Sequence, residues 1–177
     1  MKKFLPLVVV AIVSFIIAGC STSGGAGGTA GTVGTSPKGL EIPIEQATLK
    51  FVEDVGAGIY KVVSTDELKK WMDEGKELTI VSTLPSEDDK KFGTIKGAKN
   101  GVMPKTEPEL TKENEDNLLE AVGPDKGQTI VVYCGFVACR RSHIGATVLA
   151  KNGYENVYRF PGGIIAWAEA GNTVAKE

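Results

Sequence analysis

The chain has 177 residues and nearly balanced charges, with 20 Lys plus Arg against 22 Asp plus Glu and a net charge of -2 at pH 7. Without a basic excess, the composition argues against a nucleic-acid-binding protein. One histidine and three cysteines argue against a zinc site, and no motif in the chain indicates a cofactor.

The first 19 residues have the pattern of a secretory signal. Two lysines precede an apolar stretch over residues 4–18, which is too short to predict a transmembrane helix. The stretch ends in IAGC, which is similar to the lipobox of bacterial lipoproteins. That resemblance implies cleavage before Cys20 and attachment of a diacylglycerol to its thiol. An ordinary signal peptide with a chance cysteine and an uncleaved anchor are the alternatives.

Residues 20–39 are mostly Ser, Thr, Gly and Ala, a composition that predicts a flexible tether. With the signal, it predicts a protein of the bacterial cell envelope. We expect a lipid anchor at Cys20 on the extracytoplasmic side of a membrane, facing the periplasm in a Gram-negative cell. Residues 40–177 have the size of one domain.

Within this domain, short apolar runs alternate with amphipathic stretches, which predicts an α/β fold with a mainly parallel sheet. A capping box at residues 64–67 marks the start of one helix. Continuous β-branched residues at 129–133 are typical of a central parallel strand. The other predicted elements are strands at residues 78–83 and 155–160, a short strand or turn at residues 98–104, helices at residues 109–122 and 142–151, and a short last helix that contains Trp167.

The central strand ends at Cys134, and the loop CGFVACRR leads from it into the next helix. Ligands of open α/β sheets bind at this end of the strands. A loop that curls into a helix N-terminus directs N–H groups inward, and neighbouring cations lower the pKa of a thiol there. Arg140 and Arg141 supply such cations. We therefore expect Cys134 to be a nucleophile that acts on a substrate bearing an oxyanion.

The stretch IVVYCGFVACRRSHIGATVLAKNGYENVYRFPGGIIAWAEAG resembles the C-terminal half of a rhodanese domain, and GTIKGAKN resembles an earlier segment of that family. The resemblance implies a three-layer α/β fold with a five-stranded, mainly parallel sheet flanked by helices. It also implies that Cys134 takes sulfane sulfur from thiosulfate or a polysulfide or persulfide donor and passes it to cyanide or a thiol, including a thiol on a protein acceptor. The loop residues implied to bind the anion are Gly135, Phe136, Val137, Ala138, Cys139, Arg140 and Arg141.

The chain departs from the family pattern in three places. Five residues separate Cys134 from Arg140, where the family usually has four, so an oxyanion enzyme for phosphate or arsenate is an alternative. Ser82-Thr83-Leu84 replaces the family's Asp-x-Arg, which favours a second alternative, a persulfide carrier or redox protein without turnover. Cys139 is an additional thiol that could resolve or relay the sulfur.

The single histidine, His143, falls in the first turn of the helix predicted after the cysteine loop. A general base is one interpretation. A surface position is the interpretation that we prefer.

Overall fold

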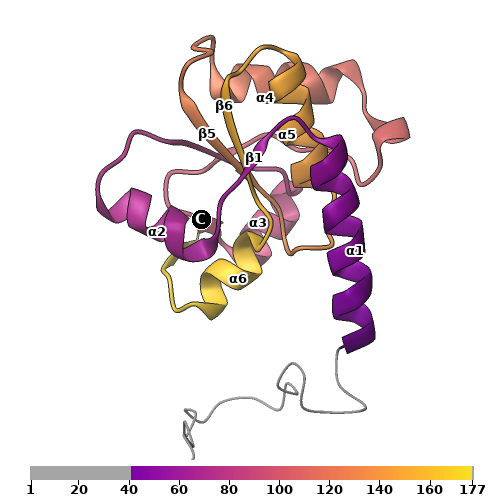
Figure 1. Cartoon of the computed structure of the whole chain (residues 1–177). Helices are drawn as coiled ribbons and strands as arrows, with labels where there is room; N and C mark the ends of the chain where they lie inside the picture. The colour runs from indigo at the N-terminus through magenta and orange to yellow at the C-terminus, as the bar shows by residue number, and fades with distance from the viewer. Residues whose placement is uncertain (1–40, 177) are drawn as a thin grey trace, which may run out of the picture.

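The computed structural model describes residues 41–176, so the signal segment, Cys20 and the tether lie outside the described residues. Helices alternate with short strands along this part of the chain (Figure 1). The helices are α1 (Glu41–Ala57), α2 (Thr65–Asp73), α3 (Ser86–Phe92), the 3₁₀-helix η1 (Glu107–Glu109), α4 (Lys112–Val122), α5 (Arg141–Lys151) and α6 (Gly163–Glu169). The strands are β1 (Lys61–Val62), β2 (Thr79–Ser82), β3 (Thr94–Ile95), β4 (Lys99–Asn100), β5 (Thr129–Tyr133), β6 (Asn156–Phe160) and β7 (Val174–Ala175).

The central sheet has five parallel strands in the order β1-β6-β5-β2-β4. Strand β5 lies in the middle, where Tyr133 pairs with Ser82 of β2 and Phe160 of β6. The predicted α/β fold and the central strand over residues 129–133 are confirmed. Strands β3 and β7 form a separate antiparallel pair that the sequence pattern did not reveal.

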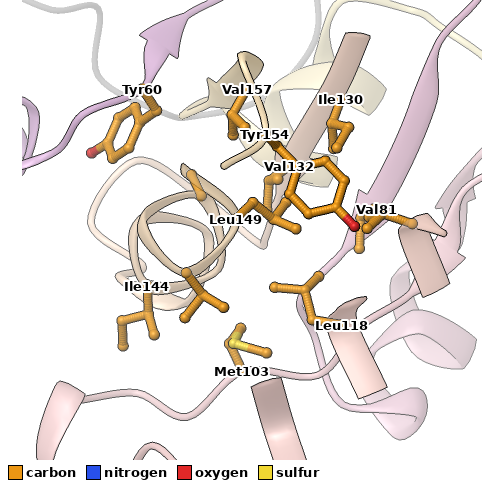
Figure 2. Packing of buried hydrophobic residues seen from close by; sticks show 13 residues of the cluster. Tyr60, Val81, Met103, Leu118, Ile130, Val132, Ile144, Leu149, Tyr154 and Val157 are labelled. Carbon is orange, nitrogen blue, oxygen red and sulfur yellow. The ribbon is translucent and has the colours of Figure 1, made fainter. Parts of the chain in front are cut away.

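Alternate residues of β5 face two apolar cores, because helices cover both faces of the sheet (Figure 1). Ile130 and Val132 point into the core on the α4 and α5 side (Figure 2). Val131 and Tyr133 belong to the core on the α2 and α6 side, and Cys134 continues that core. The first core also contains Leu118, Val122, Ile144, Val148 and Leu149, and the second contains Leu68, Phe160, Ile164 and Trp167.

Side-chain N-caps define where two of the helices, α2 and α4, begin. Ser64 accepts a hydrogen bond from the Glu67 N–H at 3.2 Å, which confirms the predicted start of α2. Helix α4 begins at Lys112, later than predicted, because Thr111 caps it by accepting from the Asn114 N–H at 3.2 Å. The preceding turn, η1, is a separate element.

Helix α1 was not predicted, and it runs along one side of the domain (Figure 1). Its apolar residues do not form one inward stripe, since Ile42, Leu49 and Val52 are exposed. A single residue of the helix, Asp54, is buried. Within residues 41–176, no helix is both long and apolar enough to cross a membrane.

A buried ion pair fastens α1 to the sheet. Asp54 accepts from Arg159 of β6 at 3.1 Å, and these side chains are 4% and 0% exposed. The Phe51 ring of α1 also lies 5.3 Å from the Arg159 guanidinium. A buried charge without a partner destabilises the fold, so the loss of either Asp54 or Arg159 should destabilise the domain as long as the other remains.

The turn after β6 brings α6 against the cysteine loop. The Ile164 N–H donates to the Cys134 carbonyl at 2.9 Å, and the Ile165 N–H donates to the Gly135 carbonyl at 3.1 Å. Gly163 has φ +63°, and a Cβ there would overlap the backbone of Cys134 and Gly135. A glycine is therefore required at this contact.

We predict that Asp54→Asn lowers the free energy of unfolding by about 3–5 kcal/mol, because Arg159 is left buried without its counter-charge. Chemical denaturation measures the change. Asp116→Asn is the matched control, since Asp116 pairs with Lys112 at the surface, where ion pairs contribute little to stability. Equal effects of the two substitutions would contradict the role assigned to Asp54.

We predict that Gly163→Ala lowers the free energy of unfolding by about 2–5 kcal/mol, since backbone strain and steric overlap act together. Gly75→Ala separates the two causes, because Gly75 has φ +70° but nothing within 4 Å of an added Cβ. This control should lose only about 1–2 kcal/mol in the same denaturation experiment. If Gly163→Ala is as stable as Gly75→Ala, the backbone of Cys134 and Gly135 can move to accommodate the added Cβ at little cost in stability.

Candidate functional site

Cys134 follows β5 directly and is 0% exposed. Its thiol lies 3.2 Å from the Cys139 carbonyl and 3.3 Å from the Ser142 hydroxyl. Burial raises the pKa of Cys134 well above its ordinary value. The expected lowering of this pKa is therefore wrong, because the loop closes over the thiol and removes it from water.

Cys139 holds the position that we expected for Cys134. The N–H groups of Gly135 and Arg141 donate to its sulfur, and the Cys134 thiol is hydrogen-bonded to it. The hydrogen bond from Cys134 is the largest cause that lowers the pKa of Cys139 to about 6, and the two N–H groups and the Arg141 charge lower it further. The Cys139 N–H itself donates to the Phe136 carbonyl at 2.9 Å, which closes the turn. The loop thus forms an anion cradle, and a sulfur of the protein occupies it.

Outside the two thiols lies the loop cavity, a hollow of about 580 Å³. Arg141, Lys50 and Lys105 contribute positive charge to its lining. Phe136 and Ile165 are 55% and 43% exposed at this hollow. The remaining lining includes Leu84, Phe92, Ala138 and Cys139, and Asp88 contributes one carboxylate against the positive charges. A cationic and apolar lining suits an anion that carries a polarisable, weakly hydrated body.

The two arginines after the loop have different environments. Arg140 donates to Asp54 at 2.9 Å and to Glu107 at 2.8 Å, so carboxylates already neutralise its guanidinium. Arg141 makes one side-chain hydrogen bond among the described residues, to the Met103 carbonyl. Both arginines border the loop cavity, but Arg141 is the one without a carboxylate partner there. Its position favours it as the anion ligand.

Arg159 supports the loop from the buried side, a role that sequence analysis missed. It donates to the Ser142 hydroxyl at 3.2 Å and to the Cys139 carbonyl at 3.3 Å. Ser142 in turn contacts the Cys134 sulfur. The available signal was a charged residue between aromatic residues at the end of the strand predicted over residues 155–160. Its partner Asp54 gave no such signal, because the helix that carries it was not recognised.

His143 is buried, 5% exposed, which corrects the predicted surface position. The first turn of α5 lies beneath residues that follow α1, and Nδ1 of His143 is 2.9 Å from the Tyr60 hydroxyl. Burial lowers the pKa of His143, so the ring is neutral at pH 7. Its Nε2 lies 3.4 Å from Glu107, away from the thiols. These contacts support a packing role.

The replaced Asp-x-Arg segment forms a hydrogen-bonded corner beside the loop. Ser82 donates to Asp89 at 2.7 Å, and Thr83 donates to the Tyr133 carbonyl at 2.8 Å. Asn100 also donates to Asp89 at 2.7 Å. Hydroxyls and an amide therefore organise this side, where the family has a charge pair. Across residues 41–176, no group of three or more His, Cys, Asp or Glu side chains is placed to hold a metal ion.

Comparison with solved structures gives the same fold. A thiosulfate sulfurtransferase from Pseudomonas aeruginosa superposes with a TM-score of 0.57 at 17% identity, over 73% of this chain and 22% of that one. The polysulfide-sulfur transferase from Wolinella succinogenes has a TM-score of 0.53 at 18% identity, over 78% of this chain and 90% of that one. At these identities the likeness shows the fold alone.

Comparison with curated sequences finds a tRNA uridine(34) hydroxylase from Bordetella parapertussis, 28% identical over 64% of this chain. A second protein of that name, from Prochlorococcus marinus, is 30% identical over 43% of this chain. The matches cover 44% and 24% of those proteins, so this chain spans less than half of either. The profile of the rhodanese-like domain matches residues 64–170, which include β5, the cysteine loop, α5 and α6. The chain belongs to the rhodanese-like domain family.

Proposed function

We propose that this protein is a sulfurtransferase tethered to a bacterial membrane. It takes sulfane sulfur from thiosulfate or from a polysulfide or persulfide donor, carries it as a persulfide of Cys134, and gives it to cyanide or to a thiol. The observation that carries the proposal is the pair of contacting thiols beneath a cationic cavity at the end of the central strand. The tether and its lipid at Cys20 rest on the N-terminal sequence pattern.

The cavity lining supports an anionic sulfur donor. Arg141 supplies a guanidinium that can hold an oxyanion or a terminal sulfide, and the N–H groups of the loop stabilise negative charge on sulfur. The exposed rings and aliphatic side chains suit a polysulfide chain, which is apolar along its length. Structural neighbours named as thiosulfate and polysulfide transferases are consistent with this substrate class.

The alternatives have less support from the site. An oxyanion enzyme with a Cys-x5-Arg loop needs the arginine for its substrate, and Arg140 is paired with Asp54 and Glu107. The hydroxylases are matched over less than half of their length, so their activity does not extend to this chain on that basis. A persulfide carrier without turnover uses the same thiols and differs only in rate.

Only a thiolate attacks a sulfur donor, so the pH dependence of alkylation tests the site. In the reduced full-length chain, we predict that alkylation of Cys139 by iodoacetamide reaches half its maximal rate near pH 6. The rate should level off above about pH 7, where a thiol of that pKa is about 90% ionised. Cys134 should react slowly throughout, because burial raises its pKa.

Fragmentation mass spectrometry of the peptide that contains both cysteines gives each rate separately. Pre-treatment with a disulfide reductant is the control for oxidised starting material. Equal rates that rise together only above pH 8 would show two ordinary thiols and would remove the support for a nucleophile.

We predict that the protein forms thiocyanate from cyanide with thiosulfate or polysulfide as donor. Arg141→Ala should lower kcat/KM by about 10- to 100-fold, as expected for the loss of a charged hydrogen-bond donor to an anion. Lys112→Ala is the matched control, since this exposed lysine pairs with Asp116 outside the loop cavity. Colorimetric assay of thiocyanate gives the rates.

Three results would redirect the proposal. One added sulfur without turnover would identify a carrier. Hydrolysis of an aryl phosphate or reduction of arsenate, lost in Cys134→Ser, would establish the oxyanion alternative. No sulfur loading and no thiocyanate with either donor would end the sulfurtransferase proposal.

A further inference from the structure

The two thiols lie one behind the other at the end of β5. Cys139 forms part of the wall of the loop cavity, whereas the Cys134 side chain is buried and is not part of that wall. A hydrogen bond joins the two sulfur atoms. A donor that enters the loop cavity therefore reaches Cys139 before it reaches Cys134.

The polar groups around the two thiols also favour a reaction of the donor with Cys139 before Cys134. N–H groups of Gly135 and Arg141 point at the Cys139 sulfur. The Cys134 sulfur receives the N–H and the hydroxyl of Ser142, but it also faces two carbonyl oxygens, of Phe136 at 3.9 Å and of Cys139 at 3.2 Å. N–H donors stabilise a negative sulfur and carbonyl oxygens do not, so negative charge is favoured on Cys139.

The arrangement also places the second thiol in position for a transfer. Arg159 binds both the Cys139 carbonyl and the Ser142 hydroxyl, and it holds the two cysteines in contact through these groups. Arg159 is itself fixed by Asp54. The buried residues Arg159 and Asp54 thus hold the two cysteines in contact from the inside of the domain.

Resting on the sulfur transfer proposed above, we propose that Cys139 is the nucleophile that takes sulfane sulfur from the donor and that Cys134 receives this sulfur from Cys139. Sequence position in the family would assign both roles to Cys134 alone. Cys139 is then a catalytic residue that faces the donor, and Cys134 stores the persulfide beneath it.

The first step is attack by the Cys139 thiolate on the terminal sulfane sulfur of the donor. A sulfur–sulfur bond forms on Cys139, the sulfur–sulfur bond of the donor breaks, and the electron pair leaves with the rest of the donor, as sulfite in the case of thiosulfate. In the second step Cys134 loses its proton as it reacts and attacks, as a thiolate, the terminal sulfur of the Cys139 persulfide. The proton of Cys134 passes along the existing hydrogen bond to the sulfur of Cys139, which leaves as a thiol. No oxidant or reductant is consumed.

The test follows sulfur loading on the reduced full-length chain, on Cys134→Ser and on Cys139→Ser, with thiosulfate as the donor. Samples are quenched over time, and fragmentation mass spectrometry under non-reducing conditions locates the added sulfur. Each variant retains the other thiol, so the two variants control for each other. Thermal unfolding verifies that both variants fold, and Cys139→Ala repeats the loading test without a hydroxyl in the cradle.

We expect the unsubstituted chain to gain sulfur first on Cys139 and then on Cys134. Cys134→Ser should trap the sulfur on Cys139, because the acceptor of the second step is missing and the serine hydroxyl can still donate a hydrogen bond to the Cys139 sulfur. Cys139→Ser and Cys139→Ala should load Cys134 at least about tenfold more slowly, because the remaining thiol is buried and protonated.

Loading of Cys134 at the full rate in both Cys139 variants, with no loading in Cys134→Ser, would overturn the assignment and leave the sulfurtransferase proposal intact. Release of sulfide together with a Cys134–Cys139 disulfide would overturn the second step. Absence of any loaded sulfur and of thiocyanate in the unsubstituted chain would overturn both proposals together.

Discussion

The buried ion pair between Asp54 and Arg159 is the constraint on which the site depends. A guanidinium with 0% exposure is stable in a domain of this size only when a carboxylate neutralises it, and here the carboxylate comes from α1. Arg159 then has donors left for the Ser142 hydroxyl and the Cys139 carbonyl. One charge pair therefore anchors α1, the end of β6 and the back of the cysteine loop. Arg140 joins the same carboxylate and extends the network to Glu107 at the surface.

This network explains the different roles of chemically similar residues. Arg140 and Arg141 are adjacent, yet Arg140 lies on the side of Asp54 and completes the structural network, while Arg141 borders the loop cavity with no carboxylate partner there. Cys134 and Cys139 are separated in the same way by burial. The sheet and α6 enclose Cys134, and the turn of the loop returns Cys139 to the cavity wall. Residues of the same type therefore differ in role because they lie at different places relative to the buried Asp54–Arg159 pair.

The family profile covers residues 64–170, whereas Asp54 lies before it on α1. A segment outside the residues that the family profile matches thus contributes the counter-charge for Arg159, which lies behind the cysteine loop. The hydrogen-bonded corner of Ser82, Thr83 and Asp89 is a second departure, since hydrogen bonds stand where the family has a charge pair on the other side of the loop. The charged residues that hold the cysteine loop in place therefore lie on α1 and at the end of β6.

The α/β fold, the central strand at residues 129–133 and the place of the cysteine loop could be predicted from the sequence, because they follow from local periodicity, β-branched runs and caps. The sequence by itself could not reveal α1, whose apolar residues lack a regular inward stripe. It assigned a surface position to His143 and a low pKa to Cys134, since neither burial nor the direction of an N–H group is a local property. Only the tertiary structure decided which thiol faces the cavity and which arginine is neutralised. Both depend on Asp54 and Arg159, which are 105 residues apart in the chain and meet only when α1 packs against the sheet.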